Sequence, residues 1–183
     1  SIYYELYNAR LRVIADDLPN ASLMIARSKE IMLLLTKFWD VLATIRPEGF
    51  KSFRDYLNVA SGQQSFMFRH VEFILGNKNK AMAAVHKNVS HVYPAIMKNL
   101  ETPSFYDEVI KLLQRRGFDI SSECLDRDWT KSYQSHESIE QAWLKIYKNP
   151  QSTNDLYLFG ELLTEFADIF SRYRFQHFTT VER

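Results

Sequence analysis

One histidine near the end of the sequence has neighbours that suit chemistry at a buried imidazole. We expect a helix from Asp155 to Arg183, in which His177 shares one face with Leu156, Gly160, Leu163, Phe166, Ala167, Phe170, Tyr173 and Val181. A buried neutral imidazole needs a partner for each ring nitrogen, or a metal ion on one of them. No carboxylate lies three or four residues from His177 on this helix. His177 is therefore either a core histidine bonded to a backbone carbonyl or distant side chain, or an axial ligand of a haem iron.

A second candidate group would form one face of a helix in the middle of the sequence, if that helix continues through "VAS". Its members, spaced i, i+4, i+7 and i+11, are Phe50, Arg54, Leu57 and Ser61. An arginine between an aromatic ring and a leucine suits a small molecule with an apolar body and a carboxylate, because the guanidinium group binds a carboxylate through two hydrogen bonds. The alternative is a surface pair of Arg54 with Glu48 or Asp55, worth at most about 1 kcal/mol. The residues alone favour the surface pair.

Arg69 is a cation in an otherwise apolar helical stretch, and it needs an anion. Glu72, one turn later, is the structural candidate. The carboxylate of a cofactor is the functional candidate. Trp39 could donate its indole N–H to the same kind of group. No zinc-type spacing of histidine and cysteine, and no phosphate-binding glycine loop, accompanies these residues.

The elements that would position these residues are all helical. Apolar residues recur at three- and four-residue steps from Ala21 to Ile45, with Asn20 as a possible N-cap and Pro47 as a stop. Ser61 and Gln64 form a capping-box pattern for a further helix, which is apolar nearly all round. No strand pattern or internal repeat is evident. The sequence predicts an all-α helical bundle, formed by residues 1–183 as a single domain.

Composition narrows the classes of function. The chain has 23 basic and 22 acidic residues, for a net charge of +1, which argues against binding to nucleic acid or a membrane surface. Cys124 is the one cysteine, so no intrachain disulfide is possible and a reducing, cytoplasmic setting is expected. The longest apolar run, Ile31–Leu35, is far shorter than a membrane span.

Three stretches of the sequence resemble the tryptophan 2,3-dioxygenases. They are "FWDVLATIRPEGFKSFRDYLNVASGQQSFMFRHVEFILGNKN", "PSFYDEVIKLLQRRGF" and "YRFQHFTTVER". The first stretch is long, ordered and specific, and the resemblance extends over essentially the whole chain.

The resemblance implies an all-helical haem b enzyme, usually a homotetramer built as a dimer of dimers. Such an enzyme adds both atoms of O2 to the indole C2–C3 bond of L-tryptophan and gives N-formylkynurenine, the opening reaction of tryptophan catabolism by the kynurenine route. By position, His177 corresponds to the iron ligand, and Trp39 and Arg69 to residues near the haem propionates. Arg54 corresponds to the residue that binds the substrate carboxylate. The rest of the substrate and haem-edge set is Phe50, Leu57, Ser61 and Gly62.

The sequence also departs from the family pattern. Gln63 replaces an aromatic residue, and Tyr173 replaces a tryptophan one turn before the iron ligand. The family's distal histidine segment and its Gly-Thr-Gly-Gly loop have no counterpart in these residues. We therefore expect a part of a longer enzyme, one that lacks a full distal pocket and is inactive by itself. Two alternatives remain: a relative with a different haem oxygenation of an aromatic amino acid, and a haem-free helical interaction module.

Overall fold

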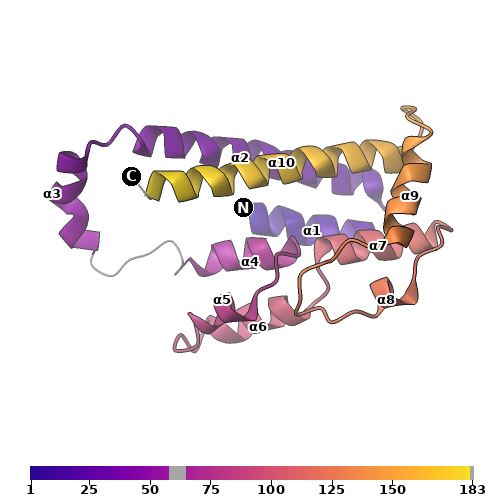
Figure 1. Cartoon of the computed structure of the whole chain (residues 1–183), viewed down its shortest axis with the longest axis horizontal. Helices are drawn as coiled ribbons and strands as arrows, with labels where there is room; N and C mark the ends of the chain where they lie inside the picture. Colours follow the sequence, from indigo (N-terminus) through magenta and orange to yellow (C-terminus); the bar gives the residue numbers. More distant parts are fainter. Residues whose placement is uncertain (58–64, 182–183) are drawn as a thin grey trace.

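The computed structural model describes residues 1–57 and 65–181, and over these ranges it is helical with no strand (Figure 1). This confirms the predicted all-α class. The helices are α1 (Ile2–Ile14), α2 (Leu18–Leu42), α3 (Pro47–Leu57), α4 (Phe66–Ile74), α5 (Lys80–Ala84), α6 (Tyr93–Glu101), α7 (Phe105–Arg115), α8 (Ser122–Leu125), α9 (Glu137–Tyr147) and α10 (Asp155–Val181). No described helix is long and apolar enough to cross a bilayer.

Helix α2 begins earlier than the sequence predicted. Asp17 is the N-cap, and its carboxylate accepts a hydrogen bond from the Asn20 backbone N–H at 3.3 Å. The Asn20 side chain also donates to Asp17, at 2.8 Å, so Asn20 is not the cap. Pro47 does not directly stop α2, which ends at Leu42; it opens α3, since the fixed φ of proline suits the first turn of a helix.

Both ends of helix α7 are defined by local interactions. Ser104 and Asp107 form a reciprocal capping box at its start. After its last residue, Gly117 adopts φ +88°, a left-handed conformation that glycine accepts without steric cost. The predicted capping box at Ser61 lies outside the described residues, and α4 begins instead after Ser65, whose side chain accepts from the Phe68 N–H.

The two longest helices, α2 and α10, extend along the length of the molecule and run side by side in the same direction (Figure 1). Their register is visible in two polar contacts. Lys29 Nζ lies 2.9 Å from Glu165 Oε2, and eleven residues further along both helices, Gln176 donates to Asp40. Equal steps on both helices require a parallel pair. This pairing brings the last turns of α2 against the last turns of α10.

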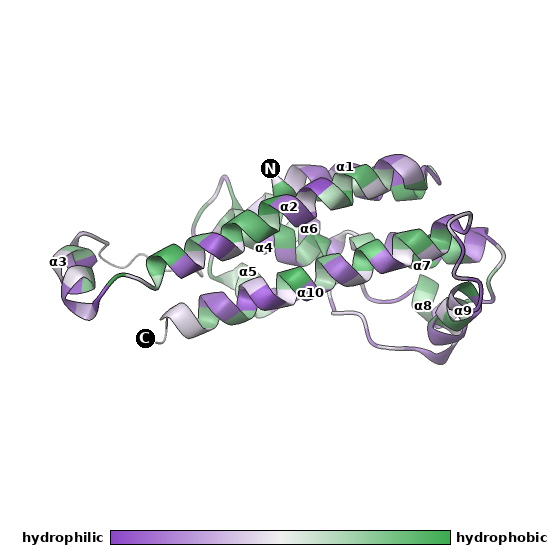
Figure 2. Ribbon diagram, turned by 90° about the horizontal axis from the view of Figure 1, so that it is seen from above, coloured by the Kyte–Doolittle hydropathy of each residue, from purple (hydrophilic) through white to green (hydrophobic). Residues whose placement is uncertain are grey.

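The core lies at one end of this pair. Leu6 and Val13 from α1 and Leu112 and Leu113 from α7 are fully buried there, together with Ile25 of α2. At the other end, α2 and α10 extend beyond this packing, and α3 stands at the far tip of the molecule (Figure 2). Most described side chains of α3 are exposed to solvent.

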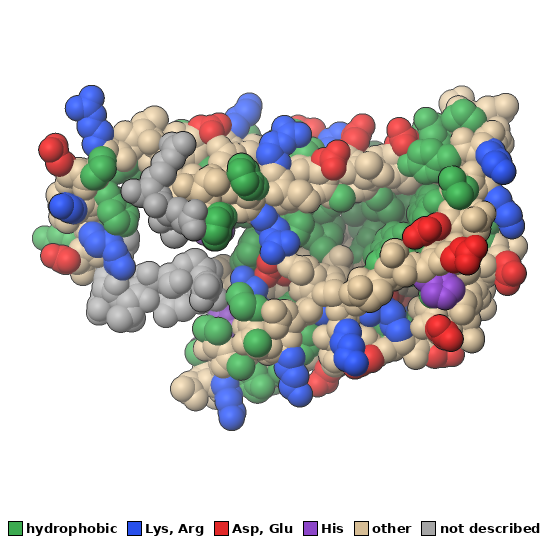
Figure 3. All heavy atoms as spheres, viewed as in Figure 1, with side chains coloured by type: hydrophobic (Ala, Val, Ile, Leu, Met, Phe, Trp, Pro, Cys, Tyr) green, Lys and Arg blue, Asp and Glu red, His purple; other side chains and the backbone are tan. Residues whose placement is uncertain are grey.

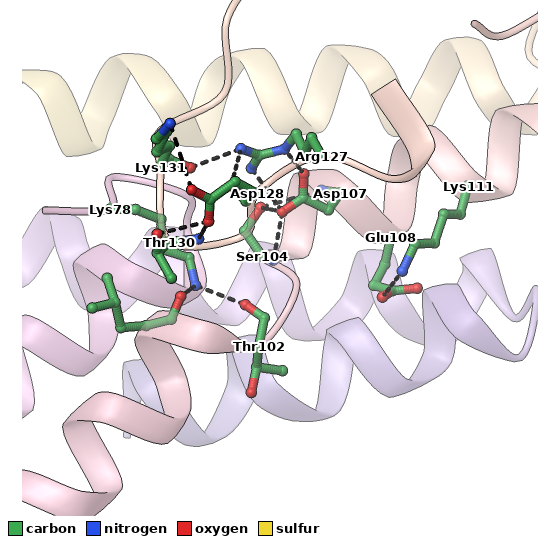
Figure 4. Close-up of polar contacts among 11 residues, drawn as sticks. Lys78, Thr102, Ser104, Asp107, Glu108, Lys111, Arg127, Asp128, Thr130 and Lys131 are labelled. Atoms are coloured by element: carbon green, nitrogen blue, oxygen red, sulfur yellow. Dashed lines mark hydrogen bonds and ion pairs between the residues drawn. The ribbon is translucent and has the colours of Figure 1, made fainter. Parts of the chain in front are cut away.

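Buried polar contacts fix the corner between α6 and α7 (Figure 4). Arg127 donates to both carboxylate oxygens of Asp107, at 2.7 and 3.0 Å. The Lys78 ammonium group donates to the backbone carbonyls of Asn99, Leu100 and Thr102, at 2.6, 2.8 and 2.7 Å. It therefore satisfies carbonyls at the end of α6 that have no partner within the helix.

Candidate functional site

His177 lies within a group of aromatic rings where α10 passes α2 and α4. The Trp39 indole stacks on its imidazole, with ring centroids 4.5 Å apart and planes 20° from parallel. Phe68 of α4 meets the imidazole edge to face, at 6.4 Å and 83°. Tyr173, one turn earlier on α10, lies 6.4 Å away at 33°. The predicted iron ligand and Trp39 are thus direct neighbours.

A cavity of about 490 Å³ opens beside this group. Its walls come from α1, α2, α4 and α10, and they are mainly apolar: Tyr3, Ile31, Met32, Leu35, Met67 and Val71. His177 and Ser65 are among the few polar side chains in the lining. Both the volume and the apolar lining are typical of small-molecule and cofactor sites.

The imidazole of His177 fits the requirement for a metal ligand. Its ring makes no hydrogen bond to another described residue. Burial lowers the pKa of His177, while the negative charge of Glu72 raises it in part. The net direction favours the neutral imidazole, the form that binds a metal. No group of three or more metal-binding side chains exists in the described residues, so any iron held here by protein would depend on this single side chain and a cofactor.

Arg69 is buried, and it has the protein partner that the sequence suggested as the alternative to a cofactor carboxylate. Its guanidinium group forms an ion pair with Glu72, as the spacing suggested. Glu72 Oε1 also accepts from Asn77 at 3.2 Å and lies 3.7 Å from Arg174 Nε. The Arg69 Nε–H has no hydrogen-bond acceptor among the described residues. That buried donor is compatible with a cofactor carboxylate, and the role of Arg69 in binding a cofactor stays a prediction.

Of the predicted substrate residues, Phe50 and Arg54 lie on α3 and are not among the described residues that line the His177 cavity. Phe50 is 42% exposed and contacts Phe53 edge to face. Arg54 lies one turn further along the exposed surface of α3. Leu57 is the last residue of α3, and Ser61 and Gly62 lie outside the described residues. Helix α3 and the last turns of α10 nevertheless occupy the same end of the molecule (Figure 1).

A larger cavity, of about 600 Å³, lies along the earlier part of α10. Figure 3 shows hydrophobic side chains gathered in this hollow. Trp143 packs so closely on Gly160 there that a Cβ at that position would lie 2.8 Å from the indole. No histidine lines the cavity. Size alone favours this space, but the smaller cavity contains the residue that can bind iron, and we take the smaller one as the candidate site.

Sequence reasoning did not find all of the residues around His177. Phe68 was seen only as part of an apolar helix, and Tyr3 was not singled out. No local pattern could have revealed that Trp39 stacks on His177, because the two residues are far apart in the sequence. The parallel register of α2 and α10 brings them together.

Comparison with known proteins gives a consistent result. A family model described as tryptophan 2,3-dioxygenase matches residues 1–102. The chain is 45% identical over 180 residues to a tryptophan 2,3-dioxygenase of Cupriavidus necator, an alignment that covers 98% of this chain and 61% of the relative. It is 46% identical over 180 residues to the tryptophan 2,3-dioxygenase of Paraburkholderia phytofirmans, covering 98% of this chain and 59% of the relative. The chain thus spans about three-fifths of the length of these relatives.

Proposed function

The chain belongs to the tryptophan 2,3-dioxygenase family, and from this premise we propose that the whole protein is a haem-dependent dioxygenase of tryptophan catabolism. It would insert both atoms of O2 at the indole C2–C3 bond of L-tryptophan and release N-formylkynurenine. The observation that carries the proposal is the single imidazole of His177, without a hydrogen bond to a described residue, at an apolar cavity of cofactor size.

In this proposal the residues around the cavity bind and orient. His177 would hold the iron of haem b, and the haem would supply the oxygen chemistry. Met32, Leu35 and Val71 exclude water from the cavity and lower the local dielectric. Trp39 and Arg69 complete the predicted cofactor set.

Substrate recognition would come from the other side of the site. Arg54 would hold the carboxylate of L-tryptophan through two charge-assisted hydrogen bonds, which fixes the indole relative to the reacting centre. Phe50 and Leu57 would form the apolar wall beside the indole. Ser61 and Gly62 would lie against the haem edge. These roles rest on the family resemblance, since none of the described side chains of α3 lines the His177 cavity.

The proposal is tested with the whole protein, loaded with haem, reduced and supplied with L-tryptophan and labelled O2. A product that carries both labelled atoms in one molecule supports the dioxygenase. A product with one labelled atom supports the alternative haem oxygenation, which Tyr173 favours because it stands beside the proposed ligand in place of the family's tryptophan. No turnover despite full haem loading contradicts both.

The His177→Ala variant separates these enzymes from a haem-free interaction module. In the haem proteins it should abolish the Soret band of a histidine-ligated haem. In an interaction module it should leave the absorption spectrum, the stability and any partner binding unchanged.

We also propose that the protein is a homotetramer. The second half of α2 exposes an apolar stripe formed by Leu34, Phe38 and Val41, which are 58%, 63% and 63% exposed, and Ile45, just after the helix, is 40% exposed. Contact with another subunit would cover it. Light scattering of the whole protein should give four subunits, and Phe38→Glu should reduce that number. Leu144→Glu, at an exposed position on α9, is the matched control.

Two further expectations belong with this function. Residues 1–183 would act as parts of a single domain, because α2 and α10 continue from the core to the candidate site. The unpaired, buried Cys124 supports a reducing, cytoplasmic setting.

A further inference from the structure

We propose that Trp39 is the positioning residue of the proposed iron ligand: its indole face fixes the plane of the His177 imidazole, and Tyr173 holds the indole in place. This inference rests on the proposed function, because it concerns how the ligand of the haem is oriented. The family resemblance placed Trp39 near the haem propionates; this inference instead places its function at the His177 imidazole.

The stacking geometry carries the argument. The indole and imidazole planes are 20° from parallel, with centroids 4.5 Å apart, at the close end of the range for aromatic pairs. Rotation of the imidazole about its bond to Cβ would drive one ring edge into the indole. Phe68, edge to face at 83°, limits the same rotation from α4. The lone pair that binds a metal lies in the imidazole plane, so fixing the plane limits the direction of the iron bond.

Among the described residues, no hydrogen bond fixes the orientation of the His177 ring. Histidine ligands of metals ordinarily donate their second N–H to a carboxylate or a backbone carbonyl, which fixes the ring. His177 has no such hydrogen bond to a described residue. Glu72 is the nearby carboxylate that acts on His177 electrostatically, but it is engaged by Arg69, Asn77 and Arg174. The ring contacts are therefore the constraint that remains.

Trp39 is itself held by the helix that carries His177. Tyr173 lies one turn before His177 on α10, with its ring centroid 6.1 Å from that of Trp39. Burial raises the pKa of Tyr173, and the Trp39 side chain beside it lowers that pKa in part. Next to Trp39, the Asp40 side chain accepts from Gln176 of α10. Trp39 and its neighbour Asp40 thus contact two positions on α10, Tyr173 and Gln176, both within the turn before the proposed ligand.

The first experiment uses the whole protein with haem bound, in the ferrous state. The iron–imidazole stretching band is recorded by resonance Raman spectroscopy, and haem dissociation is timed by transfer to an excess of a haem-binding protein. We expect Trp39→Met to broaden or shift the band and to speed haem loss at least tenfold. Trp39→Phe keeps a ring face and should stay within about threefold of wild type. Leu144→Ala, at an exposed position on α9, should match wild type.

The second experiment removes the covalent link between imidazole and helix. In His177→Gly, added imidazole should bind the haem iron in the space that the side chain leaves. In the double variant His177→Gly, Trp39→Met, the dissociation constant of the added imidazole should rise at least tenfold, because the indole on which it stacks is gone. Thermal melting of each variant shows whether it folds, and Trp39→Leu replaces Trp39→Met if the methionine variant does not.

The outcomes separate this inference from the proposed function. If the wild-type protein binds no haem through histidine, the proposed function fails. If it does, and folded Trp39→Met or Trp39→Leu gives the wild-type band and imidazole affinity, only the inference is overturned. An equally large loss in Trp39→Phe also overturns it, since the ring face would then not be the cause.

Discussion

Both halves of α2 pack apolar residues against the rest of the described chain, but the second half also leaves a stripe of apolar residues exposed. Leu18, Ala21 and Ile25 are buried against the core, whereas Phe38 and Val41, further along the same helix, are 63% exposed. Hydrophobic periodicity therefore gives the face of a helix that avoids water, and it does not give what covers that face. The first half maintains the fold, and the second half leads to the candidate site and α3.

The two regions also differ in how their polar groups are fixed. Around α6 and α7, Asp107, Arg127 and Lys78 are held by several short hydrogen bonds in buried surroundings. Around α3, most described side chains face solvent. We therefore expect substitutions at the packed end to act on stability, and substitutions at the outlying end to act on ligand binding and assembly.

Asp107→Ala should have the largest effect on stability. The change leaves the buried Arg127 guanidinium without its carboxylate and removes the capping box of α7, at a cost of roughly 3–5 kcal/mol in the free energy of unfolding. Denaturant unfolding followed by circular dichroism measures it. Asp128→Ala is the control, because its contacts with Lys131, at 3.6 Å, and with Thr130 are solvent-exposed, and their loss should cost far less stability. Equal losses in the two variants would remove the distinction between buried and exposed pairs.

Lys78→Met should lower the free energy of unfolding by roughly 2 kcal/mol at neutral pH, because the end of α6 loses a charged donor. Burial lowers the pKa of Lys78 from 10.5 to about 7 in the folded chain. Between these values the unfolded chain binds the additional proton, so the Lys78 contribution to the free energy of unfolding rises as pH increases across this window.

The test for Lys78 is the difference in unfolding free energy between wild type and Lys78→Met, measured from pH 6.5 to 9.5. The difference should grow with pH, because only the wild-type protein carries this titration. A difference that shrinks with pH would mean that the three carbonyl acceptors keep the ammonium form and raise the pKa of Lys78.

Tyr56→Ala should have the smallest effect. Tyr56 is 88% exposed on α3, and its loss should change the free energy of unfolding by no more than about 0.5 kcal/mol. Phe73→Ala is the matched change at the packed end, since Phe73 is fully buried and should cost roughly 3–5 kcal/mol. If both variants lose stability alike, the outlying end is as firmly packed as the core.

The sequence predicted elements well where the signal is local. The Gly117 end of α7 and the Asp155 start of α10 follow from turn chemistry and periodicity. The start of α2 was wrong by three residues, because Asp17 and Asn20 are both good capping residues and only the Asp17 carboxylate reaches the free N–H group. The Arg69–Glu72 pair was predictable, since both residues lie on one turn of α4.

Contacts between distant segments could not be predicted in this way. Lys78 binds backbone carbonyls, which carry no sequence signal. Arg127 reaches Asp107 from an irregular segment twenty residues later. For the candidate site, residue types pointed to His177, and the family resemblance pointed to Arg54, but the stacking of Trp39 on His177 depends on how two long helices pair.

Helix α10 runs unbroken from Asp155 to Val181, and this continuity joins the two regions mechanically. At about 1.5 Å per residue, its first turn lies roughly 33 Å from His177. That first turn is anchored at the packed end, where Arg116 binds both Asp16 and Asp155. Because the helix is continuous, a small tilt at its anchored first turn would displace its last turns. We therefore expect the ion-pair cluster of Arg116 to influence the orientation of the His177 imidazole at the opposite end of the protein.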